Sequence, residues 1–222
     1  MSKTAFIAAM VLSLLGGALA APAMAQAPHG HQHSFSGAEK WAKSFDDPAR
    51  DAWQKPHEVI TALALANDAV VADIGSGTGY FAVRLAHVVP NGRVFGVDTE
   101  PDMVAYLARR AKQAGLANLV SIAGKPNDPA LPEKVDLALM VDVYHHIVER
   151  PAYFAKLRDA LKPGGRVAII DFNAKSKVGP PVRERIAADR VKAEMREAGY
   201  RVVAEPGFLP NQYFLIFDGA PR

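Results

Sequence analysis

Short apolar runs and amphipathic stretches alternate along the chain from residue 56 to residue 217. The run AVVADI at 69–74 is apolar at almost every position, which is typical of a central parallel strand buried on both faces. The stretch at 101–114 has Pro at its start and Gly115 after its end, as helices often do. The pattern predicts strands at 69–74, 93–98, 118–123, 135–143, 166–172, 200–204 and 212–217. It predicts helices from Pro56 and at 78–89, 101–114, 150–161 and 181–198.

This alternation predicts an α/β fold. Strands separated by helices form a doubly wound, Rossmann-like sheet with right-handed crossovers. We expect seven strands, mostly parallel, with an antiparallel strand at the C-terminus. Residues 56–222 then form a single domain, and no internal repeat interrupts them.

The N-terminus has the features of an export signal. Lys3 precedes an unbroken apolar and small-residue run at 5–21, and Ala23-Met24-Ala25 forms a cleavage site of the A-x-A type. Residues 1–25 are therefore interpreted as a signal peptide, which predicts export, to the periplasm, and no membrane span after cleavage. The alternative is an uncleaved helix that anchors the protein in the membrane, although the run is short for a spanning helix.

Residues 26–37 are polar and rich in Gly and Pro, which predicts a flexible leader. His29, His31 and His33 alternate in it and could collect Zn²⁺ or Cu²⁺, or they could simply belong to a solvated linker.

Residues 38–55 mix charges with aromatic side chains just before the main domain. They could form a lid, with Trp53 covering a bound cofactor and Arg50 reaching a carboxylate. They could instead form an arm that Phe45 and Trp53 pack against the sheet.

Composition narrows the classes of function. Half of the 222 residues are hydrophobic and 22% are charged, as in an ordinary globular domain. The net charge is +3 without a dense Lys/Arg run, so neither a nucleic-acid nor an acidic-lipid partner is implied by the sequence. The chain has no Cys, which excludes disulfides, thiolate metal sites and cysteine nucleophiles.

The first strand of the domain leads into a glycine-rich turn. Asp73 is followed by Gly75, Gly77 and Gly79, which allow a sharp turn and a close approach of the backbone to a ligand. The second strand ends in Asp98, where a carboxylate can accept both hydroxyls of a ribose. Together these features predict an adenosine-containing ligand.

Two residues decide between such ligands. Tyr80 stands where the dinucleotide fingerprint has its third Gly. Asp73 would meet a pyrophosphate unfavourably but suits an ammonium group. The charges therefore favour S-adenosylmethionine over NAD.

Four motifs carry a resemblance to class I S-adenosylmethionine-dependent methyltransferases. They are VADIGSGTGY at 71–80, VFGVD at 94–98, DLALMVDVYHHI at 136–147 and LKPGGRVAIIDF at 161–172. The last two look most like the branch that contains quinone C-methylases and arsenite methyltransferases. Arsenite chemistry in that branch uses thiolates, so the absence of Cys argues against that activity.

The resemblance implies roles for residues at the strand ends. Asp73 and the three glycines would surround the methionine moiety, and Asp98 would hold the ribose. The adenine would lie near Thr99, Met103 and Asp128, although the loop around Asp128 departs from the usual order. Asp142 ends the fourth strand at the mouth of the site.

His145 and His146 are the candidate general bases, because imidazole titrates near neutral pH. Adjacent residues point in different directions, so we expect at most one of them to face the acceptor. Tyr144 could orient that acceptor. Alternatively, both histidines pack and cap the following helix.

These features predict a methyltransferase that moves the methyl group of S-adenosylmethionine to a small or lipophilic acceptor. Two alternatives remain at this stage: an exported adenosine-compound-binding protein without catalysis, and an NAD-dependent oxidoreductase. The donor is made in the cytosol, which conflicts with an export signal. The sequence identifies neither the acceptor nor the oligomeric state.

Overall fold

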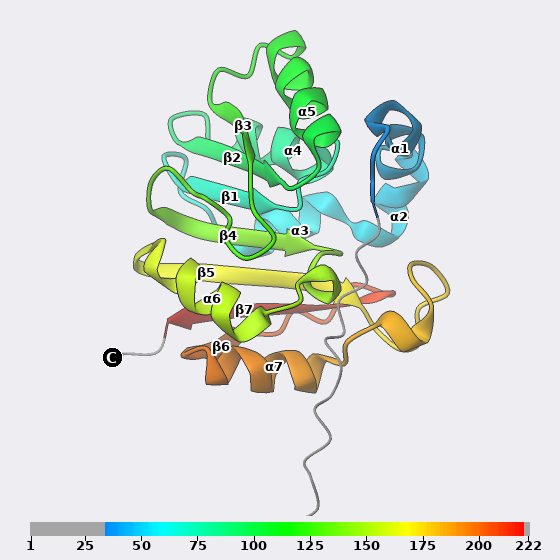
Figure 1. Ribbon diagram of the computed structural model, residues 1–222, viewed down its shortest axis with the longest axis vertical. Helices are drawn as coiled ribbons and strands as arrows, with labels where there is room; N and C mark the ends of the chain where they lie inside the picture. The colour runs from blue at the N-terminus through cyan, green and yellow to red at the C-terminus, as the bar shows by residue number, and fades with distance from the viewer. Residues whose placement is uncertain (1–33, 220–222) are drawn as a thin grey trace, which may run out of the picture.

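The computed structural model describes residues 34–219, which form a single sheet with helices on both faces (Figure 1). The expected signal at 1–25, and His29, His31 and His33 of the leader, lie outside the described residues. The strands are β1 (Val70–Ile74), β2 (Arg93–Asp98), β3 (Leu119–Ala123), β4 (Val135–Val141), β5 (Leu161–Phe172), β6 (Tyr200–Ala204) and β7 (Gln212–Gly219). The α-helices are α1 (Ala38–Phe45), α2 (Asp51–Gln54), α3 (Pro56–Leu63), α4 (Tyr80–Val88), α5 (Pro101–Gln113), α6 (Arg150–Asp159) and α7 (Ala188–Glu197). Single 3₁₀ turns are η1 (Pro48–Arg50), η2 (Tyr144–His146) and η3 (Val182–Glu184).

The seven strands lie in the order β3-β2-β1-β4-β5-β7-β6. Strands β1 to β5 pair in parallel, whereas β7 runs antiparallel to both β5 and β6. The expected fold class is therefore confirmed. Because the parallel strands all point the same way, their carboxyl ends meet along one edge, beside α1 and α2 (Figure 1).

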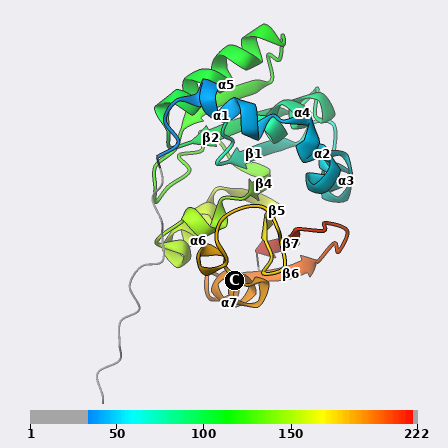
Figure 2. The same cartoon turned by 90° about the vertical axis from the view of Figure 1, so that its right-hand side faces the viewer.

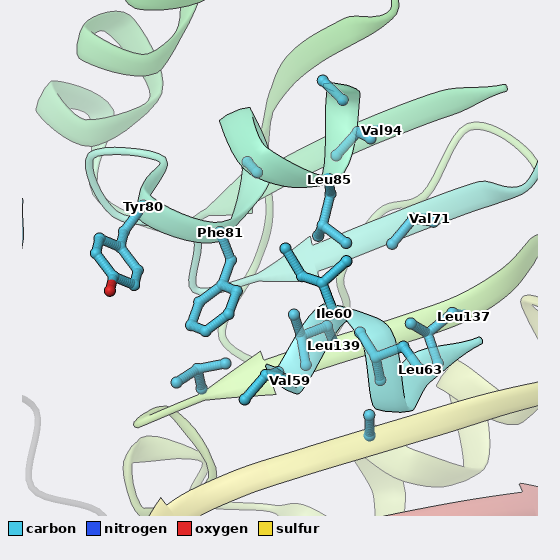
Figure 3. Packing of buried hydrophobic residues seen from close by; sticks show 14 of the residues in the cluster. Val59, Ile60, Leu63, Val71, Tyr80, Phe81, Leu85, Val94, Leu137 and Leu139 are labelled. Carbon is cyan, nitrogen blue, oxygen red and sulfur yellow. The ribbon is translucent and has the colours of Figure 1, made fainter. Parts of the chain in front are cut away.

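Helices cover both faces of the sheet and bury two apolar layers. One layer joins α3, α4 and α5 to the strands, and Figure 3 shows Phe81 and Leu85 of α4 directed at it beside Ile60 of α3. The other layer joins α6 and α7 through side chains such as Phe154 and Met195. Within residues 34–219 no helix has the length and apolar character needed to cross a bilayer.

Several expected boundaries differ from the observed ones, and three of these differences have a clear physical reason. The last helix was expected at 181–198 but begins at Ala188, because residues 173–187 form a loop that contains η3. β5 begins at Leu161 rather than 166, since Leu161 pairs with Val135 ahead of an irregularity in the β4–β5 register. α4 begins at Tyr80 rather than 78, because Gly79 takes a left-handed conformation with φ 95°.

Candidate active site

The glycine-rich turn after β1 has the backbone shape that its sequence requires. Gly75, Gly77 and Gly79 all have positive φ, at 71°, 53° and 95°. A Cβ at Gly75 would lie 2.3 Å from the Val143 side chain, and one at Gly79 would lie 2.4 Å from Leu107. The turn is held against β2, because the amides of Gly75 and Ser76 both donate to the carbonyl of Val97. Glycine is thus needed for conformation and for close packing.

Two carboxylates flank this turn. Asp73 is 3% exposed, and burial raises its pKa to about 7. Asp98 accepts from the Gly77 amide at 2.8 Å and from the Glu100 amide at 3.0 Å. Burial raises the pKa of Asp98, although these amides oppose the rise. The carboxylate expected to hold a ribose therefore also fixes the shape of the turn.

The turn contains buried hydroxyls that lack protein partners. Ser76 Oγ and Thr78 Oγ1 make no hydrogen bond in the described part of the chain, and Thr78 is 1% exposed. Buried polar groups are normally satisfied. Unmet hydroxyls and two carboxylates beside a glycine cradle fit a polar ligand that carries a cation and hydroxyl groups, such as S-adenosylmethionine.

The three residues expected near an adenine differ in placement. Thr99 is exposed, whereas Met103 is 1% exposed at the start of α5. The Asp128 side chain accepts from the Ala130 amide at 2.8 Å and closes its own turn. The structure thus gives Asp128 a local partner that the loop sequence did not suggest.

Asp142 follows β4 and belongs to a polar network that reaches the N-terminal arm. Its carboxylate accepts from Gln212 Nε2 at 2.6 Å and lies 3.5 Å from Arg50. Gln212 in turn accepts from the fully buried Gln54 at 2.7 Å. Burial raises the pKa of Asp142 to about 7, against the opposing charge of Arg50. The residue also has an unusual φ of 61°.

His145 forms a buried pair with Asp171, the penultimate residue of β5. Its Nδ1 lies 2.8 Å and 3.0 Å from the two Asp171 oxygens, and the two side chains are 6% and 1% exposed. Burial opposes the charged imidazolium, but the hydrogen bond and charge of Asp171 outweigh it and raise the pKa of His145. Because Nδ1 is held by a carboxylate, Nε2 is the nitrogen that is left for proton transfer.

The neighbours of His145 are placed differently, and the His146 ring lies against that of His145, with centroids 4.1 Å apart. His146 is partly exposed, and its ring centroid lies 5.6 Å from that of Phe35. Tyr144 is fully buried, and its hydroxyl donates to Glu194 of α7 at 2.7 Å. Tyr144 therefore packs α7 against the sheet, a placement that does not fit its expected role of orienting an acceptor.

The N-terminal arm crosses the carboxyl edge of the strands beside α5 (Figure 2). The ring of Phe45 lies 3.4 Å from the position a Cβ would take at Gly77. Phe45 stacks on Trp41, with ring centroids 5.4 Å apart, and Phe35 contacts both rings. Of the two alternatives for Trp53, packing against the sheet is the one observed, because its ring packs on Phe172, and Phe45 is the side chain over the glycine turn.

Ion pairs fasten this arm to α5. Glu39 pairs with Arg109 at 2.6 Å, and Asp46 pairs with Arg110 at 2.7 Å. Arg50 lies 3.5 Å from a carboxylate of the protein itself, that of Asp142. Arg50 also lies over the Tyr80 ring, 4.2 Å from its centroid.

Sequence reasoning missed Asp171, Gln54 and Gln212. Asp171 could have been found, because it stands at the end of a fifth apolar strand, at the same edge as Asp73 and Asp142. The glutamines gave no such signal, since their pairing joins residues 158 positions apart. Within residues 34–219 no group of His, Asp and Glu side chains is arranged to hold a metal ion.

Comparison with known proteins identifies a methyltransferase domain. A family model described as a methyltransferase domain matches residues 65–204, more than half of the chain. An arsenite methyltransferase of Halobacterium salinarum is 29% identical over 153 residues, which cover 63% of this chain and 39% of that protein. A ubiquinone/menaquinone biosynthesis C-methyltransferase of Syntrophotalea carbinolica is 28% identical over 115 residues, covering 51% and 48%. The chain thus spans about half or less of these relatives.

Solved structures agree on the fold. A SAM-dependent methyltransferase from Aquifex aeolicus superposes with a TM-score of 0.75 at 26% identity, over 81% of this chain and 97% of that one. The [4+2]-cyclase SpnF superposes with a TM-score of 0.64 at 16% identity, over 77% of this chain and 82% of that one, which shows the fold alone.

Proposed function

Because the chain belongs to the methyltransferase domain family, for which S-adenosylmethionine is the methyl donor, we propose that it methylates a small or lipophilic acceptor that loses a proton. The observation that carries the proposal is the buried His145–Asp171 pair at the carboxyl edge of β4 and β5. Ligands of doubly wound sheets bind at this edge.

The proposed donor site is the glycine turn with its two carboxylates. Asp73 would pair with the donor's ammonium, and the remaining lone pairs of Asp98 would accept from the ribose hydroxyls. Arg50 is the cation placed to take the donor's carboxylate, by exchanging Asp142 for it. Thr99, Met103 and Asp128 remain candidates for the adenine end.

When bound, S-adenosylmethionine supplies a methyl group on a sulfonium, whose sulfur leaves with the bonding electron pair. Asp171 holds His145 in the tautomer that bears its proton on Nδ1, so that Nε2 can accept a proton from the acceptor. Asp171 then stabilises the imidazolium that forms. The remainder of the chain's contribution is positioning and exclusion of water.

A base of this kind suits O-methylation and also C-methylation of an aromatic ring, because both remove a proton from the acceptor. The name of one relative, a ubiquinone/menaquinone C-methyltransferase, supports a lipophilic acceptor, and the absence of Cys speaks against the arsenite of another. We place His146 at the outer wall of the site, beside Phe35.

We further propose that the arm acts as a lid. Phe45 lies on the glycine turn, so the arm must move for a ligand to reach that surface. The half-exposed ion pairs to α5 are weak enough to break and reform.

Donor binding tests whether the chain binds S-adenosylmethionine rather than NAD. Thermal melts are recorded with S-adenosylmethionine, its demethylated product and NAD. Ligand at 100 times its dissociation constant should stabilise the protein by about 2.7 kcal/mol. A shift with the donor and product but not NAD is expected, and a shift with NAD alone would support an oxidoreductase.

Turnover tests whether His145, held by Asp171, acts as the base in methyl transfer. Formation of the demethylated donor is measured with a panel of phenols, quinols and amines, for wild type and for the Asp171→Asn and His146→Gln variants. We expect Asp171→Asn to lower kcat by about 10³ to 10⁴ at unchanged donor affinity, because the wrong tautomer is held. His146→Gln should change kcat little. Equal rates for Asp171→Asn and wild type would refute the base, and donor binding without turnover on any acceptor would favour a binding protein.

Export is also kept as a proposal. It rests on the apolar run at 5–21 followed by Ala23-Met24-Ala25. Cell fractionation with sequencing of the mature N-terminus tests it: a new N-terminus at Gln26 in the periplasm is expected. An intact Met1 in the membrane fraction would support the anchored alternative.

A further inference from the structure

The loop between β5 and α7, residues 173–187, combines exposed apolar side chains with positive charge. Val182 is 61% exposed and Val178 is 38% exposed, and together they are two of the five exposed large hydrophobics in residues 34–219. They flank Gly179-Pro180-Pro181. Figure 1 shows this gold segment projecting beyond the arrowhead of β5, at the edge where the candidate active site lies.

The loop carries a net positive charge. It contains Lys175, Lys177, Arg183 and Arg185 but a single acid, Glu184, which pairs with Arg183. Lys175 and Lys177 are exposed, and neither forms an ion pair within the described residues. The rest of the chain is nearly balanced, so this concentration is local.

The loop is ordered by its own hydrogen bonds. Arg185 donates to four loop carbonyls, those of Asn173, Ser176, Val178 and Pro180, at 2.8 to 3.1 Å. In the middle of the loop, Gly179 has φ 87° and lies so close to the Phe172 ring that a Cβ would come within 2.6 Å. The loop therefore presents its valines on a fixed turn, which lowers the entropy lost when they are buried.

We propose that residues 175–183 dock on an anionic lipid bilayer. Apolar side chains that enter the interface, ringed by lysines that stay with the headgroups, are the elements of interfacial binding. The partner must be anionic because the exposed charge of the loop is positive, and it must accept apolar groups because both valines are exposed. A protein partner would need a patterned surface that nothing in the loop specifies.

Docking would place the acceptor side of the molecule at the membrane. Phe172 lies beneath Gly179, and the charge of Glu184 in the loop acts on His145, so the docked loop lies near the proposed base. A lipophilic acceptor dissolved in the bilayer would then have a short path to it. The docking itself does not require methyl transfer, so its failure and the failure of the proposed function are distinguishable.

The absence of Cys allows a site-specific test in the full chain. Val182→Cys is labelled with an environment-sensitive fluorophore, and Val203→Cys, whose parent valine is 46% exposed on β6, is the matched control. Phosphatidylcholine vesicles with and without 30% phosphatidylglycerol are added. We expect a blue shift for position 182 with the anionic vesicles and none for position 203.

A charge variant shows whether the lysines contribute. Lys175→Gln with Lys177→Gln, in the labelled background, should weaken the response to anionic vesicles roughly 30-fold, at about fivefold per lysine. Lys112→Gln, on the exposed face of α5, should leave it unchanged. The proposal is overturned if position 182 does not respond, if both positions respond alike, or if neutral vesicles act as well as anionic ones.

Discussion

Asp73 makes the most specific thermodynamic prediction. Its carboxyl is 3% exposed and its pKa is raised from 3.8 to about 7 by burial, with the charge of Asp98 adding to the effect. A carboxyl with a raised folded-state pKa stabilises the protein fully below its unfolded pKa, and this contribution is lost as the pH rises through the folded pKa. Replacing Asp73 by the isosteric Asn should therefore stabilise the protein at neutral and alkaline pH.

The size of the effect follows from the two pKa values. A pKa difference of one corresponds to about 1.4 kcal/mol, so the difference between 3.8 and about 7 gives about 4 kcal/mol at pH 8. At pH 5 the same linkage gives about 2 kcal/mol. The same substitution should weaken the binding of S-adenosylmethionine roughly 10- to 100-fold, since it removes the charged partner proposed for the ammonium. Stability and donor affinity thus move in opposite directions.

Urea denaturation of wild type and Asp73→Asn at pH 5 and pH 8, with donor titrations at both values, measures both effects. Asp136→Asn is the control, because Asp136 lies on the neighbouring strand β4. Burial opposes its charge, but Lys162 and the Val70 amide lower its pKa. That variant should lose stability at pH 8 and keep donor affinity. The reasoning is refuted if Asp73→Asn is no more stable than wild type at pH 8, or if its gain is the same at both pH values.

Four other outcomes follow from single contacts. Gly79→Ala should lower the free energy of unfolding by about 3 kcal/mol, because residue 79 has φ 95° and its new Cβ would lie 2.4 Å from Leu107. Gly164→Ala, whose Cβ would meet nothing within 4 Å, should lower it by only about 1 kcal/mol. Urea denaturation of the two variants measures the difference. Tyr144→Phe should cost about 1 kcal/mol in the same assay and leave kcat unchanged, so a large loss of kcat would restore Tyr144 to the site. Arg50→Gln should raise the pH at which donor binding is half-maximal, measured by titration calorimetry, because Arg50 lowers the pKa of Asp73. Phe45→Ala should speed donor release in stopped-flow fluorescence, and an unchanged rate would argue against a lid.

The sheet was predictable because its signals are local. Each central strand is a nearly unbroken apolar run, and each carboxyl end carries Gly or Asp. The alternation of elements was enough to predict a mostly parallel sheet with an antiparallel end, whereas it did not give the strand order. The last helix was misplaced because residues 181–187 contain helix-forming residues, yet Arg185 binds loop carbonyls instead. Tertiary contacts of one side chain outweighed local propensity there.

The site was predictable only in part, for a related reason. Asp73, Asp98 and Asp142 could be placed because each ends a strand, but which of the two histidines is buried depends on a partner 26 residues away. Likewise, Trp53 and Phe45 are equally plausible covers when only the sequence is considered. The glycine turn leaves room for a ring above Gly77, and the distance from the turn to α1 determines that Phe45 reaches it.

Arg50 connects these features into one electrostatic unit. It belongs to the arm, yet its charge lowers the pKa of both Asp73, which is buried, and Asp142, whose side chain is 20% exposed, against the burial that raises both pKa values to about 7. If the arm opens, that charge leaves, and both carboxyls are more readily protonated. A proposed donor that needs ionised Asp73 is then favoured when Arg50 is close, which is when the arm is closed. Closure of the arm, ionisation of Asp73 and retention of the donor should therefore reinforce one another. With the arm in place, the charge of Arg50 offsets part of the free energy that the ionised Asp73 and Asp142 lose on burial.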